Sequence, residues 1–232
     1  MTLIGALFGS EGILLAADGR VSHQLDGGQN LIVADDQQKI QILTDHCAIA
    51  VTGADRIGEY FLDELRQTMR KRQTKDDVAV IAFELHKIVS TFYGKRLDDV
   101  AGIPLLNFVL AGYKQDRDRH EGAVYTLDNG AKFDPQLWLQ KFGAFGCSAY
   151  AFLLGRWLYK PNLTMSECIA LAALFISETA RMDASVGGTT RMLRITATKA
   201  CEWVSDEEIR RISEENAQIS SNFQDLFFAR AH

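Results

Sequence analysis

The sequence is poor in several features that would point to particular classes of protein. Its 232 residues include only three prolines and four cysteines, and no CxxC pair occurs, which argues against a structural zinc site. The 25 Lys and Arg residues are outnumbered by 30 Asp and Glu residues, so the net charge is −5. This acidic balance argues against a nucleic-acid or anionic-membrane partner. The cysteines are Cys47, Cys147, Cys168 and Cys201.

Long apolar runs and targeting signals are missing as well. The most apolar stretch, 169–176, is too short to span a bilayer. The opening residues lack the basic start of a secretory or transit peptide, so we expect a cytoplasmic protein without disulfides. No GxxxxGK[ST] run occurs, and no GxGxxG follows a predicted strand, so no sequence motif supports nucleotide binding. We expect neither a cofactor nor a metal.

The apolar pattern predicts an α+β fold in a single domain over 1–232, with a C-terminal helical tail over 205–232. Predicted strands lie at 3–8, 12–17, 39–43, 47–51, 105–113, 122–127, near 142, and at 189–196 and 201–204. Predicted helices lie at 57–72, 78–92, 148–159, 164–181 and from 205 onward. Capping boxes are expected at Thr164–Glu167 and Ser205–Glu208. We expect the helices to pack outside two central sheets.

Most candidate catalytic patterns fail on inspection. The segment 146–150, Gly-Cys-Ser-Ala-Tyr, differs from the G-x-S-x-G nucleophile elbow because Tyr150 replaces the second glycine. The five histidines are scattered along the chain. Thr2 is the remaining candidate, because a side chain this small permits removal of Met1. Removal would leave an α-amine, with a pKa of about 7.7–8.0, beside a hydroxyl that it can deprotonate.

The pattern around Thr2 resembles the β-type proteasome subunits and the bacterial proteasome-like hydrolases related to them. Thr2 is followed by Gly12–Ser22, which matches the run G-hydrophobic-hydrophobic-hydrophobic-A-A-D-x-R of that family. The matches continue in order to about Val204. They are Lys39-Ile40 at a strand start, Ala50–Asp55 for A-x-S-G, Gly146–Ala151 for G-S-G-S-x-Y-A, and Asp183–Gly188 for D-x-x-S-G-G.

The resemblance implies a four-layer α-β-β-α sandwich of the N-terminal-nucleophile hydrolase type, with Thr2 as the nucleophile. Lys39 would stabilise alkoxide character on the Thr2 hydroxyl, and Asp18 would hold that lysine charged and oriented. The backbone N–H of Gly53 would stabilise the oxyanion. Asp183 and Ser148 would orient the amine and its water.

Two positions depart from the family pattern, and both concern serines. Gly146 stands at the first serine of S-G-S, which would remove a hydroxyl near the amine. Val186 stands at the serine of D-x-x-S-G-G, although Ser185 is adjacent. We therefore expect Asp183 and Ser148 to arrange the amine with less help than in the family pattern.

The resemblance also suggests which residues contact substrate. Val21, Gln37 and Val51 would line the first specificity pocket, together with residues just after Gly53. If Asp55 points into that pocket, a basic substrate side chain is favoured. If Asp55 caps the following helix, the pocket is apolar, and we prefer this second interpretation.

The expected activity is that of a threonine endopeptidase acting on peptides or unfolded proteins within stacked homo-oligomeric rings, with an ATP-dependent unfoldase as a candidate partner. Apolar residues on the first two helices would serve ring stacking, or else belong to the core. Two alternatives remain open. One is an N-terminal-nucleophile amidase with a small amide substrate, and the other is a non-catalytic ring subunit, which the missing serines favour.

Overall fold

A computed structural model describes residues 2–24, 30–53, 55–73, 76–98, 103–116, 119–147 and 149–229. Its strands are β1 (Leu3–Phe8), β2 (Ile13–Ala17), β3 (Val21–Gln24), β4 (Asn30–Ala34), β5 (Ile40–Thr44), β6 (Cys47–Gly53), β7 (Leu106–Asp116), β8 (Arg119–Asp128), β9 (Gln136–Leu137), β10 (Phe142–Gly146), β11 (Arg191–Ile195) and β12 (Glu202–Trp203). Its helices are α1 (Asp55–Arg72), α2 (Val78–Tyr93), the 3-10 helix η1 (Gly94–Asp98), α3 (Ala149–Leu158), α4 (Met165–Met182) and α5 (Asp206–Ala229).

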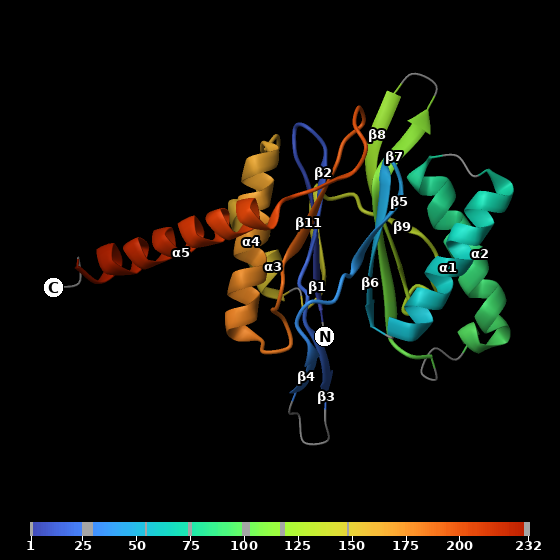
Figure 1. Cartoon of the computed structure of the whole chain (residues 1–232), viewed down its shortest axis with the longest axis horizontal. Coiled ribbons are helices and arrows are strands. Elements are labelled where there is room, and N and C mark those ends of the chain that lie inside the picture. The colour runs from blue at the N-terminus through green and yellow to red at the C-terminus, as the bar shows by residue number, and fades with distance from the viewer. Residues whose placement is uncertain are drawn as a thin grey trace.

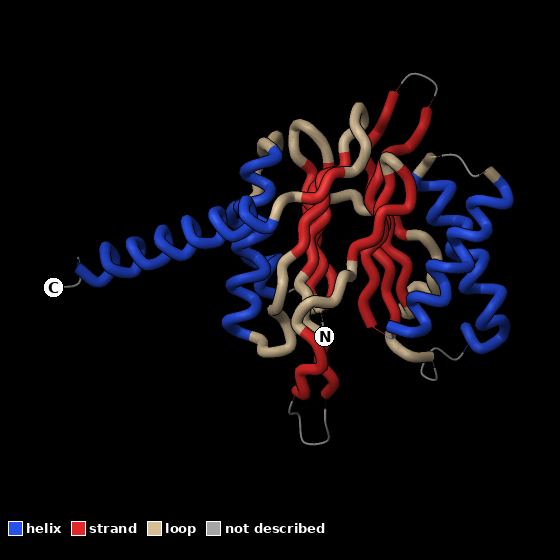
Figure 2. The backbone as a smooth tube through the Cα atoms, in the orientation of Figure 1, coloured by secondary structure: helices blue, strands red, loops and turns tan. Residues whose placement is uncertain are grey.

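The strands form two five-stranded antiparallel sheets that lie face to face between two helical layers (Figure 1). One sheet has the order β10-β1-β2-β11-β12 and is covered by α3 and α4. The other has the order β5-β6-β7-β8-β9 and is covered by α1 and α2. Figure 2 shows the same succession of helix, sheet, sheet and helix by secondary structure. The predicted four-layer α-β-β-α sandwich is confirmed.

The layers are held together by three apolar clusters. Because side chains alternate along a strand, Leu3 and Leu7 of β1 pack toward α3 and α4, while Ile4 and Ala6 pack between the sheets. This alternation explains why β1 and β2 read as nearly continuous apolar runs: both of their faces are buried. The third cluster fills the space between the second sheet and α1 and α2.

The β1–β2 hairpin fixes the residues next to Thr2. Ile4 pairs with Ala17 and Phe8 with Ile13, and the turn closes through a hydrogen bond from Gly9 N–H to Gly12 O at 2.8 Å. The strands predicted at 3–8 and 12–17 are confirmed. The register brings the end of β2, where Asp18 follows, alongside the start of β1.

Helix starts were predicted with mixed success. The Thr164–Glu167 capping box is complete, with both reciprocal bonds present. At α5 the Ser205 hydroxyl accepts a hydrogen bond from Glu208 N–H, but the Glu208 carboxylate accepts from Arg194 in β11 at 2.7 Å. The strands β3, β4 and β9 were not predicted from the sequence. Within the described residues, no helix has both the length and the apolar character needed to cross a membrane.

Candidate active site

Asp18 is the central residue of the candidate site. It follows β2 directly, and it is 1% exposed. Its Oδ1 accepts hydrogen bonds from Leu3 N–H at 2.9 Å and from Lys39 Nζ at 2.8 Å. Its Oδ2 accepts from Gly187 N–H at 3.0 Å and from Arg20 N–H at 3.3 Å. A buried carboxylate is tolerable only with such partners, and here they come from four separate segments.

Lys39 lies immediately before β5, and its ammonium group is buried with Asp18 as an ion pair. Besides Asp18, Nζ donates a hydrogen bond to the backbone carbonyl of Arg20 at 2.6 Å. The Lys39 carbonyl accepts from Val51 N–H at 3.1 Å, which ties the lysine to β6. The second sheet therefore holds this cation against the first sheet.

Hydrogen bonds of its own carbonyl and of the Leu3 backbone hold Thr2 in place. The next residue, Leu3, donates its N–H to Asp18 and accepts a hydrogen bond from Asp18 N–H at 3.2 Å. The Thr2 carbonyl accepts from Cys147 N–H at 2.9 Å. Thr2 itself is 6% exposed. Thr2, Asp18 and Lys39, which are far apart in the sequence, thus belong to one connected set of contacts.

Asp183 lies in the turn that follows α4, and it is linked to Thr2 through Cys147, whose N–H donates to the Thr2 carbonyl. Its Oδ1 accepts hydrogen bonds from both the N–H and the hydroxyl of Ser185, at 2.8 and 2.6 Å. Its Oδ2 accepts from the Cys147 thiol at 3.1 Å. Burial opposes ionisation of Asp183, but the bonds from Ser185 and Cys147 outweigh it and lower the pKa of this carboxyl group.

Cys147 was missed in the sequence, and its position corrects the interpretation of Gly146. Gly146 has a φ of +86°, and a Cβ added there would lie 1.8 Å from the Thr2 carbonyl oxygen, so no serine fits. The next residue instead directs its side chain to Asp183 and Ser185. The hydroxyl expected to be lost at Gly146 is therefore replaced by a thiol at Cys147. When the motif G-S-G-S-x-Y-A is aligned on Tyr150, its first serine falls on Gly146. When the first glycine of the motif is aligned on Gly146 instead, that serine falls on Cys147.

Burial raises the pKa of the Cys147 thiol, as does the neighbouring Asp183 carboxylate, although the contact with Ser185 opposes both. The group is therefore a neutral S–H near pH 7, and it can donate a hydrogen bond as a serine hydroxyl does. Val186 is fully buried in the apolar cluster beneath α4, and the hydrogen bonds to Asp183 come from Ser185 instead.

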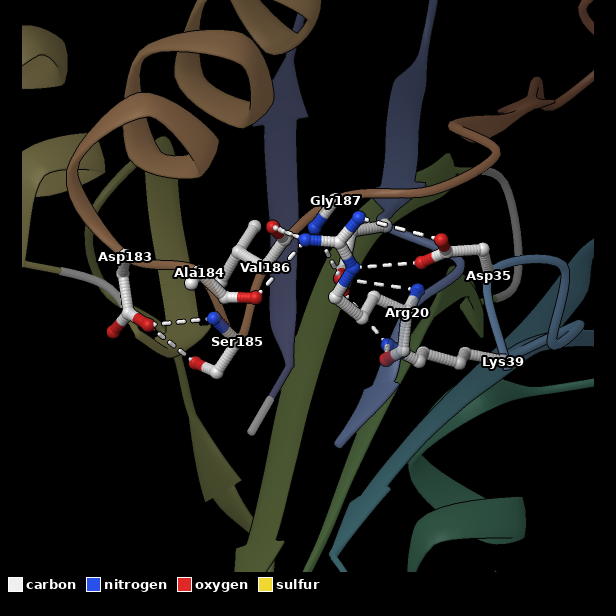
Figure 3. Close-up of polar contacts among 9 residues, drawn as sticks. Arg20, Asp35, Lys39, Asp183, Ala184, Ser185, Val186 and Gly187 are labelled. Carbon is white, nitrogen blue, oxygen red and sulfur yellow. Dashed lines mark hydrogen bonds and ion pairs between the residues drawn. The ribbon is translucent and has the colours of Figure 1, made fainter. Parts of the chain in front are cut away.

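Arg20 joins the two sides of the site, and the sequence assigned it no role (Figure 3). Its Nε lies 2.6 Å from Asp35 Oδ1, and its NH1 donates to the Ala184 carbonyl at 3.0 Å. The hydrogen bond with Asp35 raises the pKa of Arg20 and lowers that of Asp35. The guanidinium also packs over Gly187, where an added Cβ would lie 3.0 Å from Cζ. The signal for this residue was present in the D-x-R part of the motif.

Gly53 and Ser148 complete the predicted catalytic set. Gly53 ends β6 opposite Leu106 with a φ of +105°, and a Cβ there would lie 2.0 Å from the Leu105 carbonyl oxygen. The position therefore requires glycine. Ser148 lies outside the described residues, so its predicted role stays a prediction.

Two of the three predicted substrate contacts line one hollow beside the ion pair. Its lining residues are Gln37, Gln38, Lys39, Gln41, Val51, Glu59 and Leu62. Val21 is not among them and lies half-buried at the start of β3. Glu59, an exposed residue of α1, was not predicted to line this hollow. Its position one helical turn after Asp55 could have indicated it. Asp55 is the first residue of α1, but its side chain lies outside what the structure describes.

Within the described residues, no group of three or more His, Cys, Asp or Glu residues could hold a metal ion. The site is built instead from one threonine, two carboxylates, a lysine and a thiol. Such a set supports nucleophilic and proton-transfer chemistry.

Comparisons with known proteins identify relatives of the chain. A family model described as Proteasome subunit matches residues 2–195. The chain is also 28% identical over 220 residues to a protein of Thermomonospora curvata named Proteasome subunit beta 2, covering 92% of this chain and 72% of that protein. The matched region contains every described residue of the candidate site. The chain belongs to the proteasome subunit family, among its β-type members.

Proposed function

We propose that the chain is a threonine endopeptidase that uses Thr2 as its N-terminal nucleophile. The observation that carries the proposal is the shared carboxylate oxygen of Asp18, which holds both the Leu3 N–H and the Lys39 ammonium group. A buried cation thereby shares its carboxylate oxygen with the residue that follows Thr2, which supports a role for Lys39 near the proposed nucleophile. Family membership supports a proteasome-type peptidase, and the Thr2 mechanism is our addition to it.

In the proposed mechanism, the free α-amine of Thr2 takes the proton from its own hydroxyl as Oγ1 attacks the scissile carbonyl carbon. The Lys39 charge favours the alkoxide, and the Gly53 N–H stabilises the oxyanion. The amine then passes the proton to the leaving nitrogen, the C–N bond breaks, and an ester to Thr2 remains. Water hydrolyses the ester, with the same amine as its base. Asp183, Cys147 and Ser148 orient the amine and this water.

The proposal requires that Thr2 be the first residue of the working enzyme. A fusion that is cleaved directly before Thr2 supplies this form, and intact mass checks it. We expect hydrolysis of fluorogenic peptides by the cleaved chain, loss of hydrolysis in Thr2→Ala, and partial retention in Thr2→Ser. A control chain that keeps Met1 should be inactive, because its Thr2 nitrogen is an amide. Equal hydrolysis by Thr2→Ala and the unaltered chain would refute the mechanism.

A non-catalytic ring subunit is the second candidate, and the buried Val186 favours it because the hydroxyl of the family pattern is absent there. The two candidates differ in one measurement. A non-catalytic subunit with Thr2 exposed forms no ester with an N-terminal-threonine-directed electrophile such as a β-lactone. The proposed peptidase gains the mass of that electrophile on Thr2 and loses it in Thr2→Ala.

Membership of the family implies assembly into multi-subunit rings. We propose further that these rings are homo-oligomeric, stack in pairs, and act in the cytoplasm on unfolded proteins supplied by an ATP-dependent unfoldase. The exposed side chains of Tyr60 on α1 and of Phe83 and Phe92 on α2 support a contact through this helical layer. Sedimentation of the purified chain tests the homo-oligomer, since a monomer of 25.9 kDa would exclude it.

A further inference from the structure

The C-terminal helix α5 carries an apolar stripe that extends beyond the body of the protein. Ile209 and Ile212 are 6% and 5% exposed and pack in the apolar cluster beneath α4. One step further along the same face, Asn216 Nδ2 donates a hydrogen bond to the Ala170 carbonyl of α4 at 2.9 Å. Ile219 is the next position at this 3-4 spacing, and it is 65% exposed. The sequence continues the spacing at Phe223 and Leu226.

Beyond Asn216, α5 projects away from the helical layer of α3 and α4 (Figures 1 and 2). Every described side chain in this projecting part, which comprises Ala217, Gln218, Ile219, Ser221 and Asn222, is exposed. The helix continues to Ala229, so at 1.5 Å per residue it extends about 20 Å past Asn216. A free helix of this length is marginal in water, and its apolar stripe requires a cover.

A second uncovered apolar surface lies on α3, in the same layer. Tyr150, Leu153 and Trp157 share one face of that helix, at positions i, i+3 and i+7. They are 40%, 67% and 81% exposed. Exposed aromatic and aliphatic residues grouped in this way are typical of protein interfaces, where Trp and Tyr contribute most of the binding energy.

The two surfaces are complementary in charge as well as in apolar character. The projecting part of α5, residues 217–229, contains one acidic residue, Asp225, and no basic residue, which gives it a net charge of −1. The segment 149–160, which contains α3, has Arg156 and Lys160 and no acidic residue. The contacts of Ile209, Ile212 and Asn216 with α4 fix the direction of α5, so a continuous helix cannot fold back onto its own α3.

We propose that the projecting part of α5 docks on α3 of a second copy of this chain. Two copies can exchange these helices reciprocally, so that each α5 covers the other copy's α3. A twofold contact of this kind closes after two copies and buries both surfaces at once. The contact joins subunits through the layer of α3 and α4, opposite to the layer of α1 and α2. It does not depend on whether Thr2 is catalytic.

The first experiment measures mass in solution by sedimentation or light scattering. Ile219→Asp and Trp157→Asp should each reduce the mass of the assembly at least twofold at the same protein concentration. Ser221→Asp on another face of α5 should leave the mass unchanged. Leu139→Asp is the matched control for loss of an exposed apolar residue, since Leu139 is 88% exposed outside these helices. An unchanged mass in Ile219→Asp, with helix content preserved, would overturn the proposal.

The second experiment identifies the surface that α5 contacts. Chains with Ile219→Cys and with Trp157→Cys carry different affinity tags and are expressed together under oxidising conditions. The proposal expects a disulfide between the two tagged chains, and none when either is expressed alone, because a disulfide needs Cα atoms within about 7 Å. A disulfide formed by Ile219→Cys alone would mean that α5 pairs with α5, and it would refute docking on α3. Absence of any cross-link would refute it equally.

Discussion

Replacing Asp18 tests whether the buried ion pair is the structural centre of the site. Asp18→Asn keeps the shape of the side chain but leaves the Lys39 ammonium buried without its counterion. Breaking a buried pair by changing one partner costs about 3–5 kcal/mol, a large part of the roughly 5–15 kcal/mol that holds a domain folded. With a urea m value of about 3 kcal/mol/M, the unfolding midpoint should fall by about 1–1.7 M.

The assay is urea unfolding at one protein concentration, because assembly changes apparent stability. The matched control is the pair of Arg211 and Glu215, whose side chains are 60% and 57% exposed. Arg211→Met should cost less than about 1 kcal/mol. The double variant Asp18→Asn with Lys39→Met removes both charges, so it should be more stable than the sum of the single effects by about 1–3 kcal/mol, yet remain inactive. A cost for Asp18→Asn no larger than that of the surface control would refute this reasoning.

Three further predictions concern the residues around Thr2. Cys147→Ala removes the donor to Asp183 and should lower peptide hydrolysis about 10-fold or more, whereas Cys147→Ser should retain most of it; equal rates for the two variants would contradict the role of the thiol. Glu59→Gln should lower kcat/KM about 3- to 10-fold for peptides with Lys or Arg before the scissile bond and leave Leu peptides unchanged; a uniform loss would place Glu59 outside the pocket. The lowered pKa of Asp183 means that its stabilising effect is complete above its ordinary pKa of about 3.9 and is lost as the pH falls through the lower folded value. Urea unfolding should therefore show a gap between the unaltered chain and Asp183→Asn that is constant near neutral pH and closes below about pH 4; a gap that widens on acidification would mean the opposite shift.

The fold was largely predictable because its core strands and helices are strongly patterned. β1 and β2 are buried on both faces and read as apolar runs, and α1, α2 and α4 show clear helical spacing. β3 and β4 were missed because their pattern does not reflect burial. Leu31, Ile32 and Val33 of β4 are all about half exposed, and a strand without a buried face lacks the alternation that identifies strands.

The sequence predicted several residues of the candidate site but not the contacts between them. Asp18, Lys39 and Asp183 could be named because each occupies a motif, and their ion pair and hydrogen bonds follow from burial. Cys147 could not be assigned in the same way. The motif G-S-G-S-x-Y-A can be aligned with this segment in two ways that differ by a shift of one residue, and only one of them places the first serine at Cys147. Only the clash of a side chain at Gly146 with the Thr2 carbonyl decides between them.

If Thr2 is the nucleophile that we propose, the two hydrogen bonds that flank it determine what exposure of its amine involves. The Thr2 carbonyl and the Leu3 N–H are both held, by Cys147 and by Asp18, and neither bond involves the nitrogen of Thr2. In the proposed mechanism, cleavage before Thr2 would free its amine and break neither of these two bonds. Whatever precedes Thr2 would then act as the inhibitor, and its removal would need no new contact on either side of Thr2.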